Sequence, residues 1–288
     1  METIAILGAG LIGAGMAETA RRRGLDVAVW NRTRAKAEAL APLGVRACGT
    51  IEEAVRGAAR VHLAVSDDAA VDAILTTVVP ALAADAVVID HTTASPKGTA
   101  ERAARAAREG WSFLHAPVFM SPAMARAGKG MILCAGPTAT YERVKDSIAA
   151  MTGDVWYLGE RPDLAAAYKL FGNAMIITIV GGLADVFAMA SSMGVPPEAA
   201  HELFSRFKPG GTIDLRGAKM AAGDYAASFE LTMARKDVRL MIDAAGDLPM
   251  AVLPAIAARM DELIRRGEGA ADLSVLSLDA VPRPGATK

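Results

Sequence analysis

The sequence predicts an α/β protein: an N-terminal Rossmann-type doubly wound sheet followed by an all-α C-terminal domain. Up to about residue 160, short apolar segments alternate with segments of helical character, which is typical of a parallel sheet covered by helices. The first apolar segment runs directly into a glycine-rich turn. Beyond residue 160 there is no convincing strand, only stretches rich in Ala, Leu and Met that Gly and Pro interrupt. We therefore expect two domains, residues 1–160 and 161–288.

The glycine-rich turn reads Gly8-x-Gly10-x-x-Gly13 and connects a short apolar strand to a helix. Gly8 suits a tight turn, Gly10 lets the backbone approach a pyrophosphate, and Gly13 lets the helix pack closely on the strand. Glycines also occur in ordinary strand–turn–helix units, but a second strand follows at residues 26–30, where a βαβ unit places it. The turn therefore predicts a dinucleotide site, which includes Leu11 and Ile12.

The end of the second strand indicates which dinucleotide is bound. In this fold an Asp or Glu at that point binds the ribose 2′-hydroxyl of NAD, whereas an arginine accommodates the 2′-phosphate of NADP. The chain has Asn31, Arg32 and Thr33 there, and no acid. Solvated loop arginines would leave the missing acid unexplained. We expect NADP (as NADPH in reduction), and the sequence does not exclude NAD.

Further strands are predicted at residues 61–65, 86–90, 111–118, 131–136 and 155–158. Ligands of open α/β sheets bind outside the carboxyl ends of the strands. Val65 and Ser66 end one of these strands and Thr93 follows the next, so we expect all three to contact the cofactor. The alternative for Ser66 and Thr93 is to cap the following helix. Ser95, just before Pro96, is expected to do only that.

Composition and charge exclude several classes of function. The formal net charge of −1 gives no basis for binding nucleic acid. Two widely spaced cysteines show no metal-ligand spacing and suit a reducing compartment, so we expect no metal and a cytoplasmic protein. The most apolar segment, residues 170–184, is shorter than the roughly 20 residues of a spanning helix. We therefore expect a buried helix and no membrane association.

That helix carries the strongest candidate for catalysis. Residues 164–193 would span about 45 Å as one helix, and few of its positions are polar. Such a helix must be buried on several sides, between two domains or against a partner subunit. Lys169 and Asn173 lie four residues apart on one face of it. Desolvation lowers the pKa of a lysine towards neutrality, which would let Lys169 exchange a proton. The alternative is a lysine whose ammonium reaches solvent.

Four motifs in order resemble the β-hydroxyacid dehydrogenases, a family that includes 3-hydroxyisobutyrate dehydrogenase and semialdehyde reductases and whose N-terminal domain is of the 6-phosphogluconate dehydrogenase type. They are the glycine turn, Thr93-Ala94-Ser95-Pro96, the segment from Lys169 to Asn173, and Lys236-Asp237-Val238-Arg239-Leu240. Ile12 replaces the usual Met, and Ala165 replaces the leading Gly of the lysine motif. The resemblance covers the whole chain.

The resemblance implies hydride transfer between a nicotinamide and a small β-hydroxyacid or semialdehyde. It implies Lys169 as the general acid and base, Asn173 as a positioning residue, and Lys236 as a cofactor contact.

One motif departs from the family. Where the family has D-A-P-V-S-G-G to hold a substrate carboxylate, this chain has His115-Ala116-Pro117-Val118-Phe119-Met120-Ser121. Bulky Phe119 and Met120 stand where close backbone approach was needed. Either Ser121 supplies the hydroxyl from a shifted loop, or the substrate is not a small hydroxycarboxylate.

Two other functions remain open. Imine reductases resemble this architecture but usually carry Asp or Tyr at the lysine position. A non-catalytic NADP-binding protein would be expected to lose the lysine and gain basic segments, and this chain shows neither change. The apolar helical half also predicts a homodimer or homotetramer.

Overall fold

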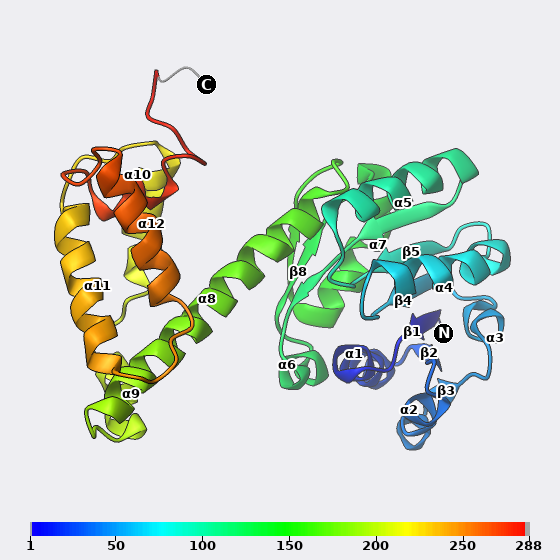
Figure 1. Cartoon of the computed structure of the whole chain (residues 1–288). Coiled ribbons are helices and arrows are strands. Elements are labelled where there is room, and N and C mark those ends of the chain that lie inside the picture. Colours follow the sequence, from blue (N-terminus) through cyan, green and yellow to red (C-terminus); the bar gives the residue numbers. More distant parts are fainter. Residues whose placement is uncertain (1, 286–288) are drawn as a thin grey trace. The chain divides into compact units, whose positions relative to one another are not determined.

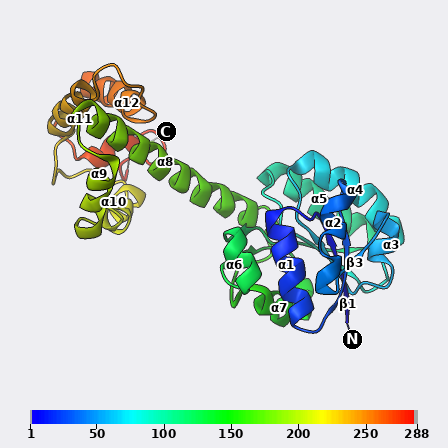
Figure 2. The same cartoon turned by 90° about the horizontal axis from the view of Figure 1, so that it is seen from below.

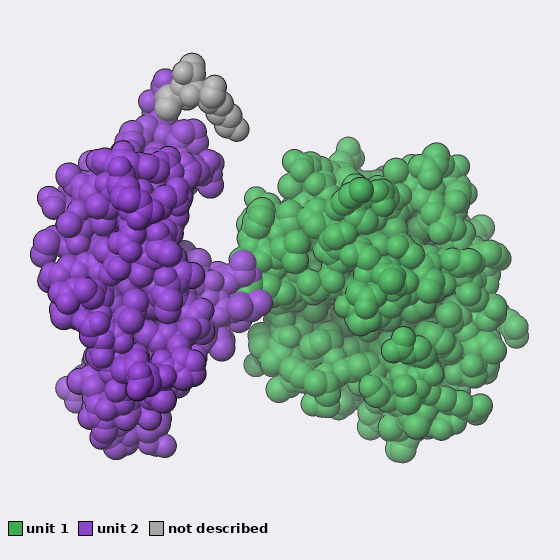
Figure 3. Space-filling model, viewed as in Figure 1, with its two compact units in different colours: residues 1–173 green, residues 174–288 purple. Residues whose placement is uncertain are grey.

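The computed structural model describes residues 2–285 and divides into two compact units, residues 1–173 and 174–288 (Figure 3). Helix α8 (Leu164–Ser192) begins in the first unit and continues into the second. The domain boundary expected near residue 160 therefore stays a prediction.

The first unit is organised around a six-stranded sheet in the order β3-β2-β1-β4-β5-β6, with every strand pair parallel (Figure 1). The strand order reverses between β1 and β4, and this reversal is where a doubly wound sheet opens a crevice for a ligand. The strands are β1 (Thr3–Leu7), β2 (Asp26–Trp30), β3 (Arg46–Ala47), β4 (Arg60–Leu63), β5 (Val87–Asp90) and β6 (Ser112–His115).

Side chains of each strand point alternately to the two faces of this sheet, and both faces are buried. Ile4 and Ile6 of β1 pack with α1 (Leu11–Arg22) and α7 (Thr138–Thr152), whereas Ala5 and Leu7 pack towards the other face. That second face is covered by α3 (Ile51–Val55), α4 (Asp68–Ala81) and α5 (Pro96–Glu109). On the first face α1 also lies beside α6 (Pro122–Ala127), where the Thr19 hydroxyl donates to the Ala125 carbonyl (Figure 2). The short α2 (Arg34–Glu38) follows β2.

The last strands of this unit differ from the sequence expectation. Residues 111–118 form two strands, β6 and β7 (Val118–Phe119), and β7 belongs to a separate three-stranded sheet with β8 (Met131–Cys134) and β9 (Asp154–Tyr157). β7 pairs antiparallel with β8, and β8 pairs parallel with β9. Pro117 lies at the break and has no N–H for a continued ladder, while its carbonyl accepts from Leu133 N–H in the new sheet.

The second unit is helical, as expected. Within residues 174–285 the only β-type pairing is an isolated bridge between Glu230 and Asp272. After α8 its helices are α9 (Pro197–Arg206), α10 (Gly211–Ala221), α11 (Leu231–Ala245), α12 (Leu253–Arg265) and the 3₁₀ segment Leu273–Ser277. Helices α11 and α12 and the 3₁₀ segment near the C-terminus supply a core that includes Leu231, Met260 and Leu263.

Helix α8 is less buried than the sequence indicates. It is long and apolar enough to cross a membrane by length and composition, and 11% of its most apolar stretch is buried in the chain. Its exposed large apolar side chains are Tyr168, Leu170, Phe171, Met175, Ile176, Ile177, Ile179 and Val180. The expected burial of this helix between two domains or against a partner subunit therefore stays a prediction.

Towards its carboxyl end α8 is fixed to folded protein. Asp185 is fully buried, and its carboxylate accepts the N–H groups of Ala251, Val252 and Leu253 at the start of α12. A carboxylate that caps a helix in this way is satisfied only within a protein fold.

Candidate functional site

The glycine turn brings three backbone segments together at the carboxyl ends of β1, β2 and β4. Gly8 has a φ of +114°, its N–H donates to the Trp30 carbonyl at 2.9 Å, and a Cβ there would overlap the Ala64 carbonyl. A Cβ on Gly13 would overlap the Gly8 carbonyl. Gly8 and Gly13 therefore have no room for a side chain.

Gly10 differs from them because a Cβ there would meet only open space. Gly10 is the N-cap of α1, and the first turn of that helix contains no acidic residue. The first N–H groups of a helix have no intrahelical partners, and the helix dipole favours an anion beside them. The open space at Gly10 thus fits the pyrophosphate of a dinucleotide.

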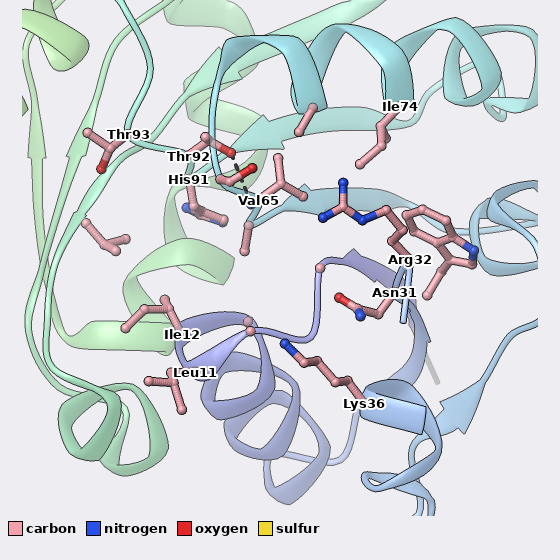
Figure 4. A pocket seen from close by; sticks show the side chains of 18 of the residues that line it. Leu11, Ile12, Asn31, Arg32, Lys36, Val65, Ile74, His91, Thr92 and Thr93 are labelled. Atoms are coloured by element: carbon pink, nitrogen blue, oxygen red, sulfur yellow. Dashed lines mark hydrogen bonds between the residues drawn. The ribbon is translucent and has the colours of Figure 1, made fainter. Parts of the chain in front are cut away.

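Asn31, at the end of β2, holds the glycine turn in place. Its Oδ1 accepts the Ala9 N–H at 2.9 Å, and its Nδ2 donates to the Thr33 carbonyl at 2.9 Å. Beside it, Arg32 and Lys36 are exposed cations that line the same pocket from the start of the α2 segment (Figure 4). Together they fit a 2′-phosphate better than a 2′-hydroxyl.

The ends of β4 and β5 form the opposite wall. Val65 N–H donates to the Thr92 hydroxyl at 3.3 Å (Figure 4). Thr92 N–H donates to Oδ1 of the buried Asp90 at 2.9 Å. The Ser66 hydroxyl pairs with the Asp67 carboxylate. The bond between Val65 and Thr92 connects the two loops that follow β4 and β5.

Two buried histidines lie behind this wall. His91 Nδ1 is 2.7 Å from the Ala116 carbonyl, so Nδ1 carries a hydrogen and Nε2 accepts from His62 Nδ1 at 2.9 Å. Burial lowers the pKa of His91 to about 4, although the Ala116 carbonyl and Asp90 act in the opposite direction. Burial, followed by the proximity of His91, holds the pKa of His62 well below its usual range. Both imidazoles are therefore neutral at pH 7.

These segments enclose a cavity of about 660 Å³, and Figure 4 shows its labelled lining. The cavity is lined by every cofactor-binding residue that was predicted within the first 100 positions: Gly8, Gly10, Leu11, Ile12, Gly13, Asn31, Arg32, Thr33, Val65, Ser66 and Thr93. It also includes Lys169 and Met120, so the candidate proton donor faces the dinucleotide pocket.

Lys169 lies on the first turns of α8, and its ammonium rests on the face of an aromatic ring. Its Nζ is 4.0 Å from the centroid of Phe119, and the side chain is half-buried. Burial lowers the pKa of Lys169 below its usual value. A lysine with a lowered pKa in a pocket is a candidate acid or base.

The remaining predicted residues do not line this cavity. Asn173 is partly buried one turn after Lys169 on the same helix. The Ser121 hydroxyl is the N-cap of α6 and accepts Met124 N–H at 3.2 Å. Lys236 belongs to α11 of the second unit, where Nζ pairs with Asp237 at 2.9 Å. Their roles in binding or catalysis stay predictions.

Several lining residues were not predicted. Lys36 is the most informative, because it adds a second cation at the adenosine end. His91, Thr92 and Val118 also line the cavity, as do Trp30, Ala64, Ala70, Ala73 and Ile74. The position of Lys36, one turn beyond Arg32 in a predicted helix, was the available signal. Within residues 2–285, no group of three or more His, Cys, Asp or Glu side chains is arranged to hold a metal ion.

A parallel sheet in this strand order, with the glycine turn at its point of reversal, defines a Rossmann-type dinucleotide-binding fold. Residues 3–159 match the NAD binding domain of 6-phosphogluconate dehydrogenase. Residues 164–277 match the NAD-binding domain of NADP-dependent 3-hydroxyisobutyrate dehydrogenase. The chain belongs to the β-hydroxyacid dehydrogenase family and is an NAD(P)-dependent oxidoreductase.

The individual relatives are named for different reactions. The chain is 27% identical over 271 residues to glyoxylate/succinic semialdehyde reductase 2 of Arabidopsis thaliana, covering 91% of this chain and 74% of that protein. It is 25% identical over 288 residues to 3-sulfolactaldehyde reductase of Escherichia coli, covering 96% and 95%. A reductive aminase from Aspergillus terreus superposes with a TM-score of 0.87 at 25% identity, covering 97% of this chain and 99% of that one.

Proposed function

We propose that this protein is an NADP-dependent reductase that transfers hydride between the nicotinamide and the carbonyl carbon of a small β-hydroxyacid or semialdehyde-type substrate. The observation that carries the proposal is Lys169, a half-buried lysine with a lowered pKa in the same cavity as the glycine turn. The two relatives named as aldehyde reductases support the reaction type.

The preference for NADP over NAD rests on the adenosine end of the cavity. Arg32 and Lys36 supply two cations for a 2′-phosphate, and no carboxylate follows β2 to bind a 2′-hydroxyl. Asn31 serves the glycine turn and so stays neutral towards both cofactors.

In the proposed mechanism the protein supplies geometry and one proton. Bound NADPH supplies the hydride for the carbonyl carbon. In reduction Lys169 Nζ donates a proton to the carbonyl oxygen, and in oxidation the neutral amine accepts the alcohol proton. Asn173, one turn further along the helix, orients the substrate or the lysine. Rates of reduction should fall as the pH rises through the pKa of Lys169, because the proton donor is lost.

The test is oxidation of NADPH and of NADH over a panel of small aldehyde acids, uncharged aldehydes and cyclic imines. Turnover of an aldehyde with NADPH supports the proposal, and the panel identifies the substrate class. Equal rates with NADH would remove the cofactor preference. A panel on which no carbonyl compound reacts would overturn the reaction type.

A second candidate, imine reduction, is favoured by the substrate loop. Phe119 and Met120 replace the small residues that hold a carboxylate in the family, so the wall beside Lys169 is apolar. The similarity to a reductive aminase also favours imine reduction. Activity on cyclic imines without activity on aldehydes or ketones would establish this candidate instead.

We also propose that α8 packs against a second copy of the chain. Its exposed apolar side chains would be costly in water, and Asp185 and the α12 segment it caps do not suit a lipid environment. A dimer or tetramer covers the helix without exposing that carboxylate to lipid.

The mass of the particle in solution tests this assembly. A multiple of 29.9 kDa is expected in light scattering, and Ile177→Asp, which places a charge on the exposed face, should shift it towards the monomer. A wild-type monomer, or recovery of the protein with membranes, would overturn the proposal.

A further inference from the structure

The Phe119 ring and Lys169 form an arrangement that the reaction chemistry alone does not require. The ammonium of Lys169 lies 4.0 Å above the ring centroid, on the ring face. The electron-rich face of an aromatic ring attracts a cation, most strongly where water is excluded. The ring therefore offers Lys169 a defined resting place inside the pocket.

The ring is itself held by the backbone of α8. A Cβ on Gly172 would overlap the tip of the Phe119 ring, since its nearest neighbours there are ring atoms Cζ, Cε1 and Cε2. Gly172 thus creates a notch in the helix, three residues after Lys169, and the ring occupies it. A helix interior pays a propensity cost of about 1 kcal/mol for a glycine relative to alanine.

The other side of the ring is fixed by the small sheet. Phe119 pairs with Met131 in the β7–β8 ladder and packs against Leu133, Ala135 and Ala165. Gly130 has a φ of +110°, and a Cβ there would collide with Met120 and the Phe119 carbonyl. The strand that presents the ring is therefore closely confined.

We propose that Phe119 is a positioning residue for Lys169: its ring, seated in the Gly172 notch, fixes the place of the ammonium group in the pocket. This inference rests on the proposed function for its catalytic consequence. The same ring covers the ammonium from water, and burial is the cause of the lowered pKa of Lys169. The other titratable side chains that line the pocket are His91 at the end of β5 and Arg32 and Lys36 after β2.

The primary test measures Lys169 directly. Reductive ¹³C-methylation of the full-length protein gives each lysine an NMR resonance whose shift follows its titration, and loss of a resonance in Lys169→Arg assigns Lys169. Phe119→Ser should raise the pKa of Lys169 towards the usual value of about 10.4, because hydration of the ammonium outweighs the lost attraction of the ring, which is worth about 0.5–1 kcal/mol where water is present. Phe119→Leu keeps apolar bulk beside the ammonium and adds no para-hydroxyl against Gly172, so the pKa of Lys169 should stay low.

Gly172→Ala provides a second variant that leaves Phe119 itself intact. Its methyl group should displace the ring and raise the pKa of Lys169 in the same direction as Phe119→Ser. Gly217→Ala in α10 is the matched control, because a Cβ there meets open space. It should leave the Lys169 resonance where it is.

Kinetics then measure the consequence for the reaction. With the substrate found in the panel, Phe119→Ser should lower kcat about 10- to 100-fold with KM within about twofold, and move the basic limb of the pH profile upwards. Phe119→Leu, which keeps the apolar cover, should move the pH profile less than Phe119→Ser does. If Phe119→Ser and Gly172→Ala leave the titration of Lys169 unchanged, the proposal is wrong.

The titration needs no substrate, so the two proposals fail separately. If Lys169→Ala is fully active, the proposed function fails while the effect of Phe119 on Lys169 can still be observed.

Discussion

The two ends of the cavity differ in which part of the chain forms them: backbone groups at one end and side chains at the other. At the glycine turn the chain removes side chains, so that backbone N–H groups and open space at Gly10 receive the ligand. Around Lys169 the chain adds bulk, with the Phe119 ring filling a notch in α8. The glycine turn suits the pyrophosphate that all dinucleotides share. The end at Lys169 suits the group on the substrate that receives the proton. Cofactor binding and chemistry should therefore be separable by mutation.

Lys169→Ala is the sharpest test of that separation and the largest expected effect. Loss of a general acid typically lowers the rate by about 10²- to 10⁴-fold, so kcat/KM for carbonyl reduction should fall within that range. The Kd for NADPH, measured by fluorescence titration, should change by less than about twofold because the backbone end is intact. Lys97→Ala, at an exposed lysine of α5, is the control and should be as active as wild type. Wild-type rates for Lys169→Ala would make Lys169 structural.

Gly13→Ala should lower the stability of the glycine turn, whereas it removes no contact to the cofactor. Its methyl group overlaps the Gly8 carbonyl, and overpacking of this kind typically costs about 1–3 kcal/mol of the free energy of unfolding. Gly10→Ala meets open space and should keep the melting temperature of wild type while weakening NADPH binding. Urea unfolding and NADPH titration of both variants distinguish the two roles. Equal stability of the two variants would contradict the geometry.

The histidine pair between the two ends should make stability depend on pH. The pKa of His91 is about 4 when folded and about 6.5 when unfolded, so the unfolded chain binds more protons below pH 6.5. The contribution of His91 is constant above pH 6.5 and is lost as the pH falls towards 4, by about 2 kcal/mol between pH 7 and pH 5.

Urea unfolding at pH 7 and pH 5 measures this loss. His62→Gln removes one of the two titrating imidazoles and should make stability less dependent on pH. A wild-type protein that is equally stable at both values would show that the pair does not control acid stability.

The smallest expected effect lies at the adenosine end. Arg32→Ala or Lys36→Ala removes one cation from the proposed 2′-phosphate site and should raise the Kd for NADPH about tenfold, equivalent to about 1.4 kcal/mol. The Kd for NADH should not change, since it has no phosphate there. Parallel weakening of both cofactors would mean that these side chains bind a group common to the two.

Sequence reasoning succeeded where the backbone decides the structure. Gly8, Gly10 and Gly13 predicted the turn from their spacing, and a side chain has no room at Gly8 and Gly13. Ser95 caps its helix as expected from its position before Pro96. Local patterns of this kind depend on few residues that are distant in the chain.

The rest depended on contacts between distant segments. The sequence shows Phe119 and Gly172 53 positions apart, and only the folded chain brings the ring into the notch. His62 and His91 end up hydrogen-bonded because β4 and β5 are neighbours in one register. The separate sheet of β7, β8 and β9 follows from Pro117 and from pairing partners that no local pattern specifies.

The hydrogen bonds of Asn31 limit how cofactor preference can change during evolution or engineering. An Asp at this position would retain an oxygen for Ala9 N–H but would turn a second oxygen towards the Thr33 carbonyl, in place of the present N–H donor. The glycine turn would lose part of its support in the same step that introduced a ligand for the 2′-hydroxyl. A change of coenzyme is therefore more accessible through Arg32 and Lys36, whose side chains hold no part of the turn.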